Sequence, residues 1–383
     1  MSGVGVNKSQ KLPPSQAQVV IIGGGIIGCS LAYHLTKIGC CDVVLLERGH
    51  LTGGTSWHAA GLIVQLRDNY TQTVLSQYTA DLYARLEQET GQATGFKRQG
   101  SMPIARTADR LTEIRRMAAL GKSFGVNVDE ISPDEAKEIW PTINTSIIKG
   151  AVYVPADGQA NPVDTTMALA KGARSGGARI YENIEVTKIL HSSSCVSGVQ
   201  TSHGKIACDI VVNCAGIWAA EVGKMAGVRV PLYAAEHMYV VTEAIKDLKE
   251  NLPIIRDTDG YIYIKEDAGK LLVGSFEPIG KPLPLNHLPE GAEFIELQED
   301  WDHFELPMSK AIELLPLLEQ TPIRKFMNGP ESFTPDNKFI MGESPELNKF
   351  FVAAGFNSSG ILSAGGAGKV MAEWIVDGQP TVD

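Results

Sequence analysis

Residues 19–47 constrain the fold of this chain most, because they read as a strand, a glycine-rich turn, a helix and a second strand that ends in an acid. Gly23 makes the tight turn, Gly25 lets the backbone approach a pyrophosphate, and Gly28 lets the helix pack closely on the strand. The helix N-terminus offers free N–H groups to the phosphates. Glu47 follows Gly28 by 19 residues, close to the distance of about 20 at which a carboxylate bonds a ribose 2′-OH and disfavours a 2′-phosphate. The segment predicts a nucleotide-binding βαβ unit.

Two other interpretations of this segment are weaker. A glycine-rich turn also occurs in α/β proteins that bind no nucleotide, but here the strand, the helix and the acid all stand where the motif needs them. Residues 19–36 contain no Asp, Glu, Lys or Arg, as a membrane span would. Because three glycines interrupt this run, which also contains His34, we expect no membrane insertion.

The composition leaves room for two domains and excludes some classes of function. The chain has 383 residues, of which 44% are hydrophobic and 20% charged. Its formal net charge of −10, without a basic stripe, argues against nucleic-acid binding. Six cysteines without CxxC spacing predict buried thiols of a reduced compartment, with no disulfide and no metal site. Residues 1–16 are expected to be a disordered leader, and no secretory signal is visible.

Hydrophobic periodicity and capping residues predict the other elements. Helices are expected at residues 70–91, 107–125 and 161–177, in a segment with Ser132 as its N-cap and Pro133 first, in most of 290–325, and from Gly368 to Val376. Strands are expected at 100–105, 177–181 and 186–190, in a hairpin of 198–201 with 206–212, and through most of 229–285.

Strands that end in small or glycine-rich turns occur near residues 23, 214 and 355, and together they predict one large ligand site. FAD fits such a site better than NAD, because its isoalloxazine must be held far from its adenine. We expect residues 17–91, 156–228 and 329–383 to form the FAD-binding domain, and residues 92–155 and 229–328 to form a substrate domain over the reactive end.

Several long motifs resemble the D-amino-acid-oxidase superfamily of flavoproteins, and within it the sarcosine and dimethylglycine dehydrogenases. The motifs are the GGGIIG turn after Ile22, LLERGHLTGGTSWHAAGL (45–62), VVNCAGIWA (211–219), EHMYVVTE (236–243), PESFTPDNKFIMGESPE (330–346) and GFNSSGILSAGGAGK (355–369). The resemblance covers residues 17–380, and GLIVQLR (61–67) and MAGVRVPL (225–232) favour the sarcosine dehydrogenases. It implies an α/β fold with an FAD-binding, Rossmann-like domain of the glutathione-reductase type and a second, antiparallel α+β substrate domain.

The resemblance assigns the cofactor site. In related dehydrogenases the histidine of the WH motif is bonded to the flavin, so His58 is the expected covalent attachment point of FAD. Backbone N–H groups of the loop 355–360 are expected to stabilise negative charge at flavin N1 and C2=O. The predicted cofactor-binding residues are Gly23, Gly25, Gly28, Glu47, Arg48, Thr55, Ser56, His58, Ala60, Gly61, Leu62, Val186, Ala215, Gly216, Trp218, Gly355, Asn357, Ser358, Ser359 and Gly360.

Three residues are the candidate catalytic groups. Arg67 is expected to anchor a substrate carboxylate, because a guanidinium binds carboxylate bidentately. His237 and Tyr263 match family residues over the flavin face, where a neutral His or Tyr can take the ammonium proton or orient the amine. Tyr261, which strand alternation places on the side of Tyr263, is the alternative to Tyr263, and Glu236 is expected to point away. Each of these residues could instead be structural: a surface arginine, or half-buried residues of a sheet.

The resemblance implies an FAD-dependent amine dehydrogenase that oxidises the N-methyl group of a small amino acid, sarcosine first and dimethylglycine next. Hydride passes to flavin N5, and the products are formaldehyde and the demethylated amine. Electron-transfer flavoprotein is the implied acceptor and the mitochondrial matrix the implied location; without the resemblance the location would be cytoplasmic. The family enzymes continue into a folate-binding half, so a form limited to the flavin domain and a truncated form both stay open, as does the oligomeric state.

Two alternatives remain. WDHFE (301–305) is similar to the non-enzymatic regulatory subunit of pyruvate dehydrogenase phosphatase, although that relative lacks the histidine that matches His58. An amine oxidase that uses oxygen directly is the third hypothesis, although no lysine placed to speed reaction with oxygen is evident.

Overall fold

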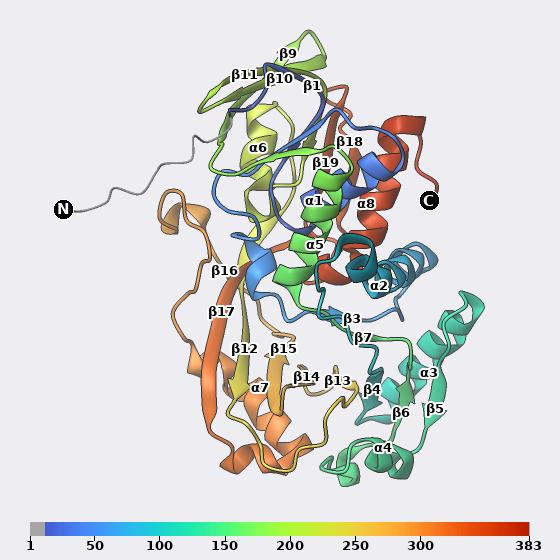
Figure 1. Cartoon of the computed structure of the whole chain (residues 1–383). Coiled ribbons are helices and arrows are strands. Elements are labelled where there is room, and N and C mark those ends of the chain that lie inside the picture. Colours follow the sequence, from blue (N-terminus) through green and yellow to red (C-terminus); the bar gives the residue numbers. More distant parts are fainter. Residues whose placement is uncertain (1–11, 383) are drawn as a thin grey trace, which may run out of the picture.

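The computed structural model describes residues 12–382 (Figure 1). Most of the expected leader, residues 1–16, therefore lies outside the described residues, and its last residue, Gln16, already belongs to the first strand. Two large sheets organise the chain, and Figure 1 shows them in the upper and lower halves of the molecule. No helix among the described residues is long and apolar enough to cross a membrane.

The first sheet has the order β18-β19-β11-β1-β2-β8, and β9 and β10 extend from β11 as an antiparallel meander. All neighbours from β19 to β8 are parallel, and β18 is antiparallel to β19. The strands are β1 (Gln16–Ile22), β2 (Val43–Leu46), β8 (Arg179–Tyr181), β9 (Val186–Ser192), β10 (Cys195–Thr201), β11 (Gly204–Asn213), β18 (Ile340–Glu343) and β19 (Phe350–Ala354). This is the predicted Rossmann-like arrangement.

Helices cover both faces of this sheet, because its central strands are apolar on both sides. Val19 and Ile21 of β1 enter a core with α1, α2, α5 and α8, whereas Val20 and Ile22 enter a second core with α6, β9 and β10. The helices are α1 (Ile26–Lys37), α2 (Tyr70–Thr90), α5 (Pro162–Ser175), α6 (Ala219–Met225) and α8 (Gly360–Asp377).

The start of α8 corrects the sequence-based expectation of a helix from Gly368. The helix begins at Gly360, eight residues earlier. Its glycines allow close contact with neighbouring helices: a Cβ on Gly366 would overlap Leu75 of α2, and one on Gly368 would overlap Ser30 of α1. Tertiary packing therefore overrides the low helix propensity of glycine.

The second sheet has the order β16-β12-β15-β14-β13-β4-β6-β5, and β17 pairs with β12. All its pairings are antiparallel except that of β13 with β4. The strands are β4 (Ser101–Ala105), β5 (Asp129–Ile131), β6 (Gly150–Tyr153), β12 (Tyr233–Thr242), β13 (Ile254–Asp257), β14 (Ile262–Asp267), β15 (Lys270–Ser275), β16 (Lys281–Pro282) and β17 (Ile323–Phe333). The expected domain boundary at residues 328/329 falls inside β17, which pairs with β12 along its length.

One face of the second sheet packs on helices and the other carries polar side chains. Ile255, Ile264 and Val273, which follow one another across the strands, lie in an apolar core with α4 (Pro133–Ile139), α7 (Trp301–Leu314) and η5 (Pro316–Gln320). A smaller core lies under α3 (Ala108–Ser123). The opposite face is described with the site below.

Short elements complete the chain. They are η1 (Thr55–His58), β3 (Leu62–Ile63), η2 (Thr145–Ile147), β7 (Gly158–Gln159), η3 (Gly216–Trp218) and η4 (Leu285–His287). Helix α4 begins as predicted, with Ser132 as its N-cap and Pro133 first, and the structure adds a capping box with Glu135. The prediction of a mainly helical segment over residues 290–325 is wrong at both ends, because residues 290–300 are irregular and β17 begins at Ile323. Two prolines, Pro307 and Pro316, bound or interrupt the helical part.

Candidate functional site

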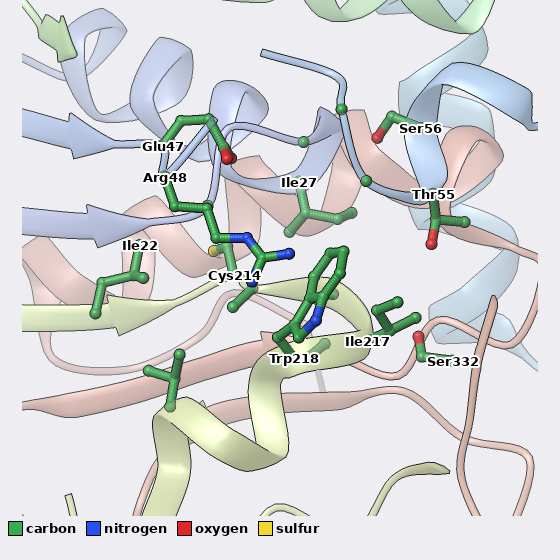
Figure 2. Close-up of a pocket in the computed structure, with 18 of the residues that line it drawn as sticks. Ile22, Ile27, Glu47, Arg48, Thr55, Ser56, Cys214, Ile217, Trp218 and Ser332 are labelled. Carbon is green, nitrogen blue, oxygen red and sulfur yellow. The ribbon is translucent and has the colours of Figure 1, made fainter. Parts of the chain in front are cut away.

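The main cleft opens at the carboxyl ends of four parallel strands of the first sheet. The residues that follow β1, β2, β11 and β19 line it, and it contains about 1460 Å³ free of protein atoms, part of which is open to solvent (Figure 2). The carboxyl edge of a parallel sheet is where open α/β folds bind ligands. Of the predicted cofactor residues, the cleft is lined by Gly23, Gly25, Glu47, Arg48, Thr55, Ser56, Val186, Ala215, Gly216, Trp218, Gly355, Asn357, Ser358 and Gly360.

The glycine turn has the geometry that a dinucleotide needs. Gly23 has a φ of +114°, and a Cβ there would overlap the carbonyl of Cys214. A Cβ on Gly28 would overlap the carbonyl oxygen of Gly23, so this glycine holds α1 close to β1 although it does not line the cleft. Gly25 is the N-cap of α1 and has no side chain to fill the space beside the first helical N–H groups. Ser56 Oγ accepts from Ile26 N at 3.0 Å.

Glu47 stands at the end of β2 and its carboxylate is held by the backbone. Gly24 N donates to Oε2 at 2.7 Å and Gly49 N donates to Oε1 at 2.8 Å. Burial raises the pKa of Glu47, and these two hydrogen bonds oppose that rise. The carboxylate is therefore fixed beside the glycine turn, where a ribose hydroxyl would be bound.

A cation stacked on an indole closes one wall of the cleft. The Arg48 guanidinium lies 3.8 Å from the centre of the Trp218 ring, and Figure 2 shows the two groups side by side. Arg48 Nη2 also donates to the carbonyl of Ala292 at 3.0 Å. The cation–π contact and this hydrogen bond join segments after β2, after β11 and before α7.

His58 ends η1 and is buried, and its Nε2 has no hydrogen-bond partner among the described residues. Its ring lies against Gly329 of β17, where a Cβ would come within 2.6 Å of His58 Cε1. Burial lowers the pKa of His58, while the negative charge of Glu331 opposes the shift. The imidazole is therefore neutral near pH 7, with an unsatisfied nitrogen beside the second sheet. His58 itself does not line the cleft, although its neighbours Ser56 and Ala59 do.

The polar face of the second sheet gathers the other candidate residues. Arg256, Tyr263, Gly274 and Tyr239 follow one another across four adjacent strands, so their side-chain positions share one face. The Tyr263 ring occupies the space above Gly274, where a Cβ would overlap it. His237 lies two residues before Tyr239 on β12 and therefore on the same face. It is paired with Gly329, the residue against which the His58 ring lies.

His237 forms a buried pair with Glu277. Its Nδ1 lies 2.8 Å from Glu277 Oε2. Burial alone would lower the pKa of His237, but the charges of Glu331 and Glu277 raise it to about 9. Burial raises the pKa of Tyr263 well above its usual value. At neutral pH His237 is therefore a positively charged imidazolium and Tyr263 a neutral phenol, whereas the sequence led us to expect a neutral histidine.

Arg67 is half-buried and lies near a second arginine, Arg256. Its Nη2 donates to Ser359 Oγ at 3.1 Å, and its Nε has no partner among the described residues. Burial and the nearby Arg256 lower the pKa of Arg67 to about 10. Neither guanidinium forms a salt bridge within residues 12–382. The charges of the exposed Asp68 and of the buried Asp157 act on both guanidinium groups, and burial raises the pKa of Asp157 to about 7. Arg67 and Arg256 are thus two neighbouring, half-buried cations that form no salt bridge among residues 12–382.

Six predicted cofactor residues lie outside the cleft lining: Gly28 and His58, described above, and Ala60, Gly61, Leu62 and Ser359. Ala60 and Gly61 connect η1 to β3, which begins at Leu62, and a Cβ on Gly61 would overlap the carbonyl oxygen of Ala160. Ser359 instead binds Arg67. The prediction that Tyr261 shares the side of Tyr263 is wrong, because Tyr261 lies in a turn before β14 with a φ of +59° and is 36% exposed.

Glu236 points away from His237, as expected: its Oε2 accepts from Asn328 Nδ2 at 2.7 Å and lies 3.2 Å from Lys281 Nζ. Sequence reasoning missed Arg256, Glu277 and Glu331. Strand alternation from Tyr263 does not reach Arg256, because the two residues are on different strands. Glu331 lines the cleft and accepts from Ser358 Oγ.

The comparison with protein families identifies the fold. Residues 18–374 match the family model described as DAO, FAD dependent oxidoreductase. The chain belongs to this family. The matched region contains both sheets, the cleft, and the histidine and arginine positions described above, so the predicted FAD-oxidoreductase fold is confirmed.

The relatives include N-methyl amine enzymes. The chain is 45% identical to 4-methylaminobutanoate oxidase (formaldehyde-forming) of Paenarthrobacter nicotinovorans, over 97% of this chain and 45% of that one. It is 44% identical to human mitochondrial sarcosine dehydrogenase, over 97% and 41%, and 43% identical to the mouse mitochondrial regulatory subunit of pyruvate dehydrogenase phosphatase, over 96% and 42%. The chain thus spans less than half the length of these relatives. Among solved structures, L-proline dehydrogenase of P. horikoshii matches with a TM-score of 0.87 and 26% identity, over 97% and 96%.

Proposed function

We propose that this chain carries an FAD-dependent oxidative demethylation of a small N-methyl amino acid, with sarcosine as the first substrate to test. Membership of the family and the activities for which two relatives are named support the reaction class. The observation that carries the proposal is the pair of half-buried arginines, Arg67 and Arg256, which forms no salt bridge within the described chain. An amino acid supplies the carboxylate that this pair lacks.

The cleft fits FAD by its own chemistry. The space beside Gly25 and the free N–H groups of α1 suit a pyrophosphate, and the fixed Glu47 carboxylate suits a ribose. The loop after β19 would meet the pyrimidine end, and His58, with its unpaired Nε2, would hold the ring covalently. Bound flavin would supply the hydride acceptor.

The polar sheet face would hold the amine. Arg67 and Arg256 would fix the carboxylate, and Ser359 would keep Arg67 in place through its 3.1 Å hydrogen bond. Tyr263 and His237 hold protons at neutral pH and therefore act as donors. The substrate would then react as its free amine, whose proton has passed to solvent before the methyl group is oxidised.

The length of the substrate and the electron acceptor are the finer parts of the proposal. Sarcosine, dimethylglycine and 4-methylaminobutanoate share a carboxylate and an N-methyl group but differ in chain length and substitution. We propose a dehydrogenase that passes electrons to a protein acceptor of the electron-transfer-flavoprotein type. We also propose a mitochondrial location, because two of the relatives are named as mitochondrial proteins. Peroxide production would assign an oxidase instead.

The first test separates an enzyme from a flavin-fold regulatory protein. Purified protein is mixed without oxygen with each of the three amines, and bleaching of the flavin absorbance and release of formaldehyde are measured. Sarcosine is expected to bleach the flavin fastest. If none of the amines bleaches the flavin of a fully loaded protein, the enzymatic proposal is wrong and the regulatory alternative takes its place.

A second test addresses the covalent link. The protein is denatured in acid, and flavin colour is followed in the polypeptide and the supernatant. Colour should stay with the wild-type chain and leave His58→Ala. Free release of flavin from the wild type would remove the covalent part of the proposal without affecting the fold.

A further inference from the structure

The carboxylate of Glu277, which follows β15 directly, is held from three sides. His237 Nδ1 lies 2.8 Å from Oε2, while Met238 N and Ser275 Oγ donate to Oε1 at 3.0 Å and 2.6 Å. The side chains of His237 and Glu277 are only 11% and 8% exposed. A carboxylate that accepts three hydrogen bonds remains ionised, and the pKa of Glu277 is accordingly lowered, because the charge of His237 and these bonds outweigh burial.

This arrangement fixes the protons of the imidazole. Because an ionised carboxylate only accepts, Nδ1 of His237 must carry a proton, and any second proton resides on Nε2. Glu277 therefore sets both the tautomer and the ring orientation of His237, as a carboxylate behind a histidine does in many sites.

A second carboxylate approaches the same ring from β17. Glu331 is buried and lies two residues after Gly329 on β17, and Gly329 is the cross-strand partner of His237. His58 of η1 also lies near His237. Tyr263 of β14 lies near the same two acids, Glu277 and Glu331. Tyr239, the next residue on this face of β12, lies near Glu331. His58 and His237 disfavour charge on each other, but His58 is itself neutral near pH 7. Tyr239 and Tyr263 are neutral phenols at that pH. Two acids thus surround one imidazole.

We infer that Glu277 is a positioning residue that, with Glu331, keeps His237 as an imidazolium whose Nε2–H is a donor and not a base. The inference deepens the proposed function and rests on it only for its consequence, which is a fixed positive charge on the sheet face that also carries Arg256. His237 would then help to bind anionic ligands, and its loss of charge would weaken them.

The direct test is the titration of His237 by NMR in flavin-loaded protein with isotope-labelled histidine, assigned with His237→Gln. In the wild type the His237 signal should titrate well above the ordinary pKa of about 6.5. In Glu277→Gln, which keeps the shape of the side chain, the midpoint should fall by about 1–3 pH units. Glu236→Gln is the matched control, since Glu236 is the next residue on β12 but binds Asn328 and Lys281.

A second variant and a second readout keep the inference testable if Glu277→Gln fails to fold. Glu331→Gln leaves the 2.8 Å contact of Glu277 in place and should also lower the midpoint, but without changing the tautomer. Binding of acetate is measured from the flavin spectrum. Its affinity should fall as pH rises, and the pH at which it falls should be lower in Glu277→Gln than in wild type. Neither readout needs turnover, so failure of the amine tests would leave this result standing.

Two results would overturn the inference. A wild-type midpoint at or below about 6.5 would make His237 neutral at physiological pH. An unchanged midpoint in both folded acid-to-amide variants would mean that neither carboxylate holds the proton.

Discussion

Arg256 has the clearest consequence at the scale of single residues, because it forms no salt bridge in the described chain and lies across the ladder from Tyr263. Replacing it by Met keeps much of its apolar volume but removes the charge. We expect Arg256→Met, like Arg67→Met, to raise the substrate KM about 10- to 100-fold, the loss of a charged hydrogen bond of about 1.5–3 kcal/mol. Steady-state kinetics measures this. Arg98→Met, on an exposed ion pair with Asp81, should leave KM unchanged.

Glu47 supports a second prediction at this scale, for cofactor affinity. In a His58→Ala background, where flavin is free to dissociate, Glu47→Gln should weaken FAD binding about tenfold or more. The reason is that a glutamine has only one acceptor oxygen, so either Gly24 N or Gly49 N loses its acceptor, and the neutral amide is also a poorer acceptor for a ribose hydroxyl. Fluorescence titration with FAD gives the Kd. An affinity equal to that of a surface variant, Glu87→Gln, would remove Glu47 from the site.

Residue identity predicted the nucleotide half of the site well and the reactive half less well. Glu47 and the glycines stand within one continuous βαβ segment, so spacing alone places them. Arg256, Glu277 and Glu331 reach the site through pairing of strands that are distant in sequence, and nothing local marks them. The protonation of His237 was likewise hidden, because it depends on Glu277, 40 residues away.

At the scale of elements, the packing of α1 on β1 depends on the absence of a side chain at Gly28. Gly28→Ala would place a Cβ on the carbonyl of Gly23, and the helix must shift. We expect a cost of about 1–3 kcal/mol, with reduced flavin content, because the shift also displaces the turn. Thermal melting and the ratio of flavin to protein absorbance test this. Gly280→Ala, with no atom within 4 Å of the added Cβ, should behave as wild type.

Element types were predicted where local pattern and tertiary packing agree, and missed where they conflict. Helices α2 and α4 begin where the sequence predicts, and the structure shows that local caps, Asn69 and Ser132, fix these starts. The start of α8 was missed because its glycines serve contacts with α1 and α2, which a single segment does not reveal. Strand alternation failed at Tyr261 for a related reason: a turn with positive φ resets the side-chain direction.

At the scale of the whole molecule, the two halves meet through buried polar groups, and Asp157 is one of these. Its Oδ1 accepts from Gln65 N, which follows β3, at 2.8 Å, and its Oδ2 accepts from Ser101 Oγ of β4 at 2.6 Å. Burial raises its pKa from 3.8 to about 7, and nearby Arg256 opposes this rise. The junction thus carries an acid that the folded chain prefers to keep neutral.

This preference predicts how stability changes with pH. A carboxyl whose pKa is raised by folding binds its proton more tightly in the folded state, so the free energy of unfolding falls as pH rises from about 4 to 7 and is level above. The full shift corresponds to an upper bound of about 4 kcal/mol. Asp157→Asn keeps an acceptor for Gln65 N and removes the titration, so it should gain stability over wild type between pH 5 and pH 8. Melting temperatures across this range, with exposed Asp209→Asn for comparison, measure it; parallel curves for wild type and Asp157→Asn would mean that Asp157 is ionised throughout.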